Sequence, residues 1–161
     1  MENKQIFEFS KDKTDGDSSL NNLLGGKGAN LAEMSKMGIP VPPGFTITTE
    51  VCNYFTENKE LPVNLNQDII KAVSKLETFS DKSFSGKGTP LLLSVRSGGR
   101  ISMPGMMDSI LNIGLNDNNV SHLAETFNDE RFALDSYRRL IQMYSNVVLG
   151  VEHDRFEAVL A

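Results

Sequence analysis

The chain has 161 residues and a formal net charge of −5, with 39% apolar and 23% charged residues. That length and composition suit a folded domain and exclude wholesale disorder, while the acidic balance argues against a partner made of duplex nucleic acid. The single cysteine, Cys52, excludes an internal disulfide and a multi-cysteine metal site, and the absence of a long apolar run predicts a cytoplasmic protein without a signal peptide or a membrane partner.

Hydrophobic periodicity and turn residues predict the order strand, helix, strand, helix, helix, strand, strand, helix. The expected ranges are 4–10, 29–37, 45–47, 50–55, 66–79, 91–95, 110–115 and 130–149. This mixture indicates an α/β or α+β lobe. The strand over 91–95 opens with three leucines, so we expect it to be buried.

Several side chains in the first half carry expectations of their own. Thr48 or Thr49 is expected to cap the helix that begins at Glu50. Cys52 shares that helix with apolar neighbours, and we expect it to be buried and unreactive. The aspartates between residues 11 and 19 lack the glycine and glutamate of a calcium loop, so they predict a solvated connection.

Charge is distributed unevenly, and two glycine-rich windows are purely cationic. Between Ser18 and Ala32 the only ionisable side chain is Lys27, and between Thr89 and Met107 the only ones are Arg96 and Arg100. A small anion, above all phosphate, is the natural ligand of such windows.

Each window allows a structural interpretation as well. Gly25-Gly26-Lys27-Gly28 either cradles phosphate at a helix N-terminus or forms a glycine turn with a solvated lysine, and it is not a Walker A sequence because Gly28 stands where Ser or Thr is required. Arg96 and Arg100 follow an apolar run, where they either bind phosphate at a strand end or form a structural ion pair.

A shaped loop follows the second window. Pro104-Gly105 predicts a type II turn, and the methionines around it either fill core gaps or cover a nucleotide. Asp108 could bind a metal, although capping of the following residue is favoured. The two histidines, His122 and His153, have no acid–nucleophile constellation around them.

Four segments, taken together and in this order, resemble the N-terminus of the pyruvate, phosphate dikinase family. They are LLGGKGANLAEM, GIPVPPGFTITTE, LLLSVRSGGRISMPGMMDSILNIGLN and FALDSYRRLIQMYSNVV. The resemblance implies an α+β fold: the N-terminal portion of an ATP-grasp nucleotide-binding domain, with a helical subdomain toward the C-terminus. It places an α/β lobe with phosphate-binding loops over residues 1–115 and the start of a truncated helical subdomain over 116–161.

The resemblance also assigns roles by position. Lys27 matches the lysine that contacts the nucleotide phosphates, and Arg96 matches the catalytic arginine that stabilises the transferring phosphates. Gly105 and Met107, with Ser102 as a less certain member, fall in the loop that closes over them. The implied cofactor is ATP with Mg²⁺, whose protein ligands are expected beyond Ala161.

In this family, ATP phosphorylates a carrier histidine on a swivelling domain, and a barrel passes the group between that histidine and pyruvate, giving phosphoenolpyruvate. Neither the carrier-histidine motif nor the barrel is found here. We therefore expect an N-terminal fragment that carries half of an ATP site, is inactive alone, and has the remainder of a homodimeric dikinase as its partner. The alternatives are a non-catalytic nucleotide-binding or complementing module from a truncated or split gene, and a relative of phosphoenolpyruvate synthase, against which the run SMPGMMD argues.

Overall fold

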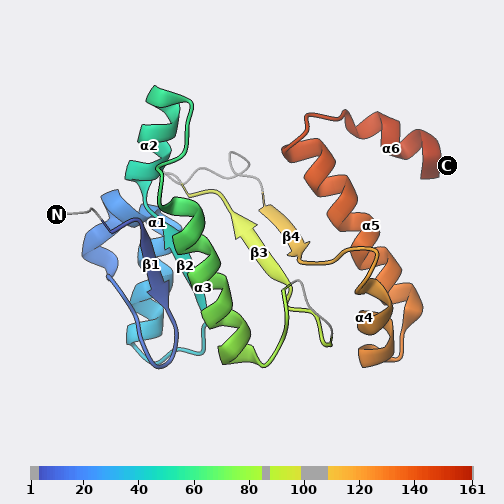
Figure 1. Ribbon diagram of the computed structural model, residues 1–161, viewed down its shortest axis with the longest axis horizontal. Coiled ribbons are helices and arrows are strands. Elements are labelled where there is room, and N and C mark those ends of the chain that lie inside the picture. The colour runs from blue at the N-terminus through green and yellow to red at the C-terminus, as the bar shows by residue number, and fades with distance from the viewer. Residues whose placement is uncertain (1–3, 85–87, 99–108, 161) are drawn as a thin grey trace. The chain divides into compact units, whose positions relative to one another are not determined.

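The computed structural model describes residues 4–84, 88–98 and 109–160. Within these ranges it contains six α-helices and two antiparallel sheets of two strands each, which confirms the α+β class. The described chain forms two compact units (Figure 1). Residues 4–79 and Gly98 belong to the first unit, and residues 80–84, 88–97 and 109–160 belong to the second.

The first unit is built around the sheet β1–β2, in which Ile6 pairs with Ile47 and Phe9 pairs with Gly44. Its elements are β1 (Ile6–Phe9), η1 (Ser18–Leu20), α1 (Asn21–Lys36), β2 (Gly44–Ile47), α2 (Thr49–Asn58) and α3 (Leu65–Ser80).

The two faces of this sheet carry different helices, because successive side chains of a strand point to opposite faces. Ile6 packs in one buried cluster with Leu65 and Ala72 of α3 and with Val51 of α2. On the other face, Thr46 lies against Gly28 of α1. The short sheet is therefore covered by α3 on one face and by α1 on the other (Figure 1).

The second unit pairs its sheet with two helices. Its elements are β3 (Leu93–Arg96), β4 (Ser109–Ile113), α4 (Val120–Phe127), α5 (Glu130–Val147) and α6 (His153–Leu160). Its core joins Ile110 and Leu115 to Leu123 of α4 and to Ala133 and Leu140 of α5. No helix in the described ranges combines the length and apolarity that a bilayer crossing requires.

Two elements differ from these expectations. Helix α1 is not one of them: it spans Asn21–Lys36 but has non-helical φ/ψ at Gly25, so its second segment agrees with the expected helix and a short additional segment precedes the glycines. The strand over 91–95 is shifted to β3 and exposed rather than buried: its pairing is irregular between Leu93 and Val95, and Val95 is 51% exposed. Helix α4 was not expected, since its eight residues are short for a periodicity signal.

Cys52 is exposed, so the expectation that it is buried is also wrong. Helix α2 buries the preceding residue, Val51. Adjacent residues of an α-helix point about 100° apart, because a turn takes 3.6 residues. A helix buried along one narrow line therefore turns Cys52 toward solvent.

Candidate functional site

The glycine run of the first cationic window interrupts helix α1. Gly25 has φ 68° and ψ 164°, a conformation that is essentially confined to glycine. The helix ends before this residue and resumes after it, so that Gly26, Lys27 and Gly28 form the first turn of the resumed segment. The first N–H groups of a helix have no helical partner and attract anions. The expectation that a helix opens on these glycines is therefore confirmed, and the half-buried Lys27 lies on its first turn.

Neighbouring backbone and side chains hold the glycine turn, which we define as residues 22–28. The Thr49 hydroxyl donates to the Asn22 carbonyl oxygen at 2.7 Å. A Cβ atom added to Gly28 would lie 2.7 Å from Cγ2 of Thr46, so the α1 backbone approaches β2 closely. A Cβ atom added to Gly98 would lie 3.9 Å from the Leu24 carbonyl oxygen, which brings the chain after β3 to the same turn.

Arg96 is the last residue of β3, where it pairs with Ser109 of β4, and its side chain is exposed. Its Nε donates to the Ser94 hydroxyl at 3.4 Å. This contact is with a neutral group rather than with a carboxylate, so it does not support the structural ion pair that the sequence left open. Lys27 lies in the first unit and Arg96 in the second. The remaining candidate residues, Ser102, Gly105 and Met107, lie outside the described residues.

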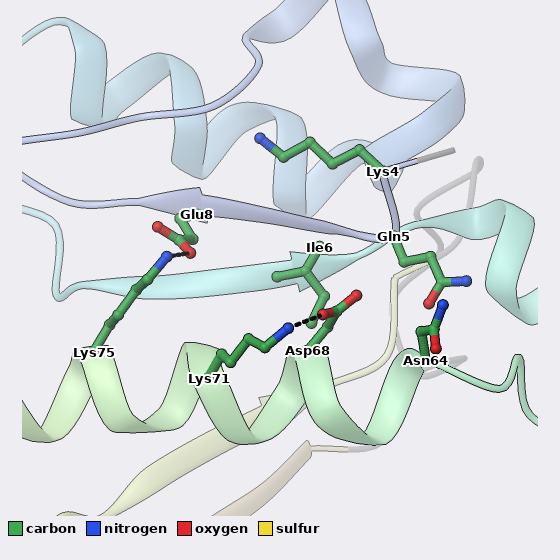
Figure 2. A pocket seen from close by; sticks show the side chains of 8 residues that line it. All are labelled: Lys4, Gln5, Ile6, Glu8, Asn64, Asp68, Lys71 and Lys75. Carbon is green, nitrogen blue, oxygen red and sulfur yellow. Dashed lines mark hydrogen bonds and ion pairs between the residues drawn. The ribbon is translucent and has the colours of Figure 1, made fainter. Parts of the chain in front are cut away.

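A pocket of about 400 Å³ opens between β1 and α3 in the first unit (Figure 2), and no residue of the glycine turn lines it. Its lining charges are paired: Lys75 contacts Glu8 at 2.5 Å and Lys71 contacts Asp68 at 3.2 Å. The first pair joins β1 to α3 and the second lies within α3, so both have an ordinary structural role. The pocket is lined by Lys4, Gln5, Ile6, Glu8, Asn64, Asp68, Lys71 and Lys75. Sequence reasoning did not find it, because evenly spaced lysines and acids are typical of any exposed helix face.

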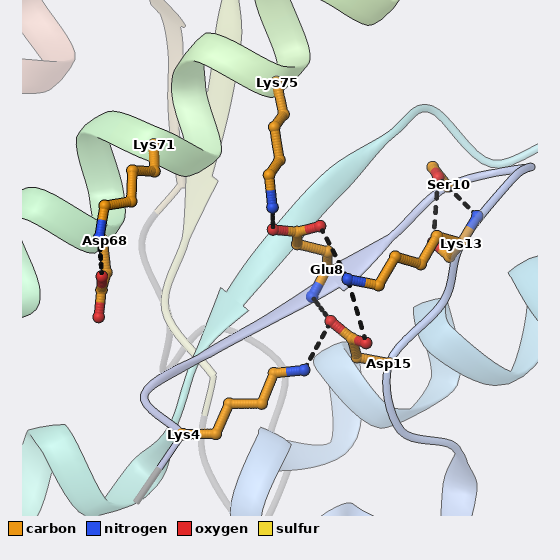
Figure 3. Close-up of polar contacts among 8 residues, drawn as sticks. All are labelled: Lys4, Glu8, Ser10, Lys13, Asp15, Asp68, Lys71 and Lys75. Carbon is orange, nitrogen blue, oxygen red and sulfur yellow. Dashed lines mark hydrogen bonds and ion pairs between the residues drawn. The ribbon is translucent and has the colours of Figure 1, made fainter. Parts of the chain in front are cut away.

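An ion-pair network continues from Glu8 to the connection after β1 (Figure 3). Asp15 accepts from the Lys4 ammonium at 2.8 Å and from the Glu8 backbone N–H at 3.0 Å, and Lys13 lies 3.9 Å away. Burial raises the pKa of Asp15, but these hydrogen bonds and lysine charges more than offset it and hold the pKa below its ordinary value.

Asp17 has a comparable role at the start of η1. It accepts from the Ser19 backbone N–H at 3.0 Å, contacts the Ser19 hydroxyl and pairs with Lys36 at 3.0 Å. The Ser19 and Lys36 hydrogen bonds lower the pKa of Asp17 to about 2. The expectation of a merely solvated aspartate loop is therefore wrong for Asp15 and Asp17, which join the loop to β1 and α1.

Replacing Asp15 with Asn is expected to lower the free energy of unfolding by about 1 kcal/mol near pH 7, because hydrogen bonds to a charged acceptor are lost. Since the folded pKa of Asp15 is depressed, its contribution is present above the ordinary pKa of about 4 and is lost as the pH falls through the folded value. Urea unfolding of both proteins between pH 2 and 7 measures the difference. Asp12→Asn, in the same connection, is the matched control, and a difference that persisted unchanged at pH 2 would contradict this assignment.

Within the described ranges, no three His, Cys, Asp or Glu side chains are grouped so that they could hold a metal ion. His122 contacts Glu125 at 3.6 Å within α4, and His153 contacts Glu157 at 3.3 Å within α6. These pairs are one helical turn apart, which is the ordinary spacing of surface contacts on a helix. The described residues of the glycine turn combine the backbone N–H groups of a helix start with the Lys27 side chain, and both kinds of group can bind an anion.

Comparison with known proteins shows what the chain as a whole is similar to. Residues 21–83 match the family described as "Pyruvate phosphate dikinase, AMP/ATP-binding domain". The chain is 51% identical over 157 residues to pyruvate, phosphate dikinase from Rickettsia conorii, covering 97% of this chain. It is 49% identical over 158 residues to the enzymes of that name from Rhizobium meliloti and Clostridium symbiosum, covering 98% of this chain in both. The chain spans 18% of the length of each of these relatives.

Proposed function

Because this chain is homologous to the N-terminal, AMP/ATP-binding part of pyruvate, phosphate dikinase, we propose that it binds an adenine nucleotide through its phosphates and forms half of an ATP site. The observation that carries the proposal is the interruption of α1 at Gly25, which makes Lys27 part of the first turn of a new helical segment. Backbone N–H groups and one ammonium group on the same turn are what a phosphate requires.

The proposed roles follow the chemistry of each group. Lys27 contacts the phosphates as a compact positive charge, and the Arg96 guanidinium, exposed at the end of β3, stabilises negative charge on the transferring group. Ser102, Gly105 and Met107 are proposed to close over the phosphates. Mg²⁺, when bound, neutralises phosphate charge, and its protein ligands are proposed to come from outside this chain.

In a protein of the relatives' length, we propose that this half-site serves phosphorylation of a carrier histidine, on the way to interconverting pyruvate and phosphoenolpyruvate. Phosphoryl transfer depends mainly on positioning and electrostatic stabilisation. The proposed share of this chain is the cationic groups for that task, and the carrier histidine and the pyruvate site are proposed to belong to the rest of a dikinase. The chain alone is therefore proposed to bind nucleotide without turnover, and its partner is the rest of a dikinase.

Replacing Lys27 with Met is expected to weaken ATP and AMP binding at least tenfold, because a charge-assisted contact with phosphate is lost while the aliphatic stem is kept. Isothermal titration of the 161-residue chain with each nucleotide, with and without Mg²⁺, measures the effect. Lys11→Met is the matched control, since Lys11 is an exposed lysine of the same unit that lies outside the glycine turn. Equal affinity of the two variants, or no binding by the unsubstituted chain at millimolar nucleotide, would refute the proposal.

A further inference from the structure

Two adjacent threonines at the start of α2 have hydroxyls in opposite situations. Thr48 occupies the N-cap position and is 2% exposed, yet its Oγ1 has no hydrogen-bond partner among the described residues. Thr49 is half-buried, and its Oγ1 donates to the Asn22 carbonyl oxygen at 2.7 Å. Neither of these residues therefore caps α2 with its hydroxyl, although the sequence predicted that one of them would. The Thr49 hydroxyl bonds instead to a carbonyl oxygen of α1.

The carbonyl that Thr49 contacts lies at a break in the backbone. Asn22 is three residues before Gly25, in the short segment of α1 that ends at the glycine. The last carbonyls of a helical segment lack helical N–H partners and need another donor. Thr49, 27 residues further along the chain, supplies one to the Asn22 carbonyl oxygen.

The same β2–α2 connection supports the turn at a second point. Thr46, three residues before Thr49, lies so close to Gly28 that no side chain fits between them. One contact thus precedes Gly25 and the other follows it. With both sides of Gly25 held by the same short stretch, residues 46–49, the orientation of the Gly26 and Lys27 N–H groups depends on that stretch.

We propose that Thr49 is a positioning residue for the glycine turn: its hydrogen bond to Asn22 orients the backbone N–H groups that receive the nucleotide phosphates. The ligand part of this inference rests on the proposed function, whereas the geometric part does not. A hydrogen bond of this kind contributes about fivefold to a local equilibrium, so its loss is expected to change local opening and nucleotide affinity by about that factor.

Three variants of the 161-residue chain test the proposal. Thr49→Val removes the hydroxyl at nearly constant volume, Thr49→Ser keeps a hydroxyl, and Thr48→Val removes a neighbouring hydroxyl that has no partner in the part of the chain that the structure describes. Amide hydrogen exchange of residues 22–28, resolved by NMR, reports on the turn without any ligand. Titration with ATP and AMP, well below the melting temperature of each variant, reports on binding.

We expect Thr49→Val to accelerate exchange in residues 22–28 about fivefold and to weaken nucleotide binding about fivefold, with both properties recovered in Thr49→Ser and unchanged in Thr48→Val. Exchange that rises evenly over the first unit, or equally in Thr48→Val and Thr49→Val, would overturn the positioning role in favour of a general structural one. Unchanged affinity in Thr49→Val, beside a Lys27→Met variant that has lost binding, would overturn it as well. If exchange responds as expected but the unsubstituted chain binds no nucleotide, the positioning of the turn is supported and only the proposed function fails.

Discussion

Gly114→Ala is expected to lower the free energy of unfolding by about 3–5 kcal/mol, the sum of a backbone strain and a steric clash. Gly114 follows β4 with φ +117°, and an added Cβ would lie 2.4 Å from the Leu91 carbonyl oxygen and 3.3 Å from the Phe84 ring. The turn cannot easily move aside, because the Gly114 carbonyl accepts from Asn119 Nδ2 at 2.7 Å and Asn119 is 3% exposed. Urea unfolding followed by circular dichroism measures the loss.

Gly88→Ala separates the two contributions. Gly88 has a similar φ, +106°, but an added Cβ would meet none of the described residues within 4 Å. Its substitution should therefore show the strain alone, about 1–2 kcal/mol. If Gly88→Ala and Gly114→Ala were equally destabilising, the close approach of Leu91 would not contribute and the explanation would be wrong.

The sequence predicted the elements whose pattern is local. Two strands and two helices form where alternation, helical spacing and turn residues predicted them: β1 (Ile6–Phe9), β2 (Gly44–Ile47), α3 (Leu65–Ser80) and α5 (Glu130–Val147). Each of these signals depends on residues within a few positions of one another, and the side chains that they bury are in the two cores. The α+β class follows from their order.

Properties that depend on distant contacts were not predictable. The exposure of Cys52 depends on how α2 is rotated, and that of Val95 depends on which side chains of the β3–β4 sheet the helices cover. The role of Asp15 depends on Lys4 and on the backbone of β1, which approach it only when the chain folds. The composition of the chain and the spacing of its residues do not predict such contacts between distant residues.

The candidate site shows the same division. The sequence shows the glycines and Lys27, the only ionisable residue between Ser18 and Ala32, and it predicts that a helix opens at them. The interruption at Gly25, the hydrogen bond from Thr49 and the close approach of Thr46 are not, because residues 46–49 read as an ordinary strand end and helix cap. The residue types thus indicated which groups are present for binding an anion, whereas contacts between distant segments decide how those groups are oriented.

Gly28→Ala is expected to lower the free energy of unfolding by about 1–2 kcal/mol and to weaken nucleotide binding, although alanine favours helices over glycine by about 1 kcal/mol. An added Cβ would lie 2.7 Å from Cγ2 and 2.8 Å from Oγ1 of Thr46, and 3.3 Å from Cβ of Leu24. Thr46 is β-branched and part of β2, so one of its two γ atoms meets the new methyl group unless the strand or the helix moves. Any such movement displaces the first turn that carries Lys27.

Thr46→Ala should reverse the sign of this effect, since it removes both γ atoms and leaves space for the methyl group. In that background Gly28→Ala is expected to stabilise the chain by several tenths of a kcal/mol, as helix propensity then dominates. The double-mutant cycle, measured by urea unfolding, should give a coupling of about 2 kcal/mol, and nucleotide titration should show the affinity that Gly28→Ala loses returning in the double variant. Additive effects would mean that Thr46 is not what excludes a side chain at residue 28. A coupling in stability without recovery of binding would mean instead that the phosphates need the glycine itself, because its backbone N–H is unobstructed. The two measurements together therefore distinguish the packing of Gly28 against Thr46 from the recognition of phosphate by the turn.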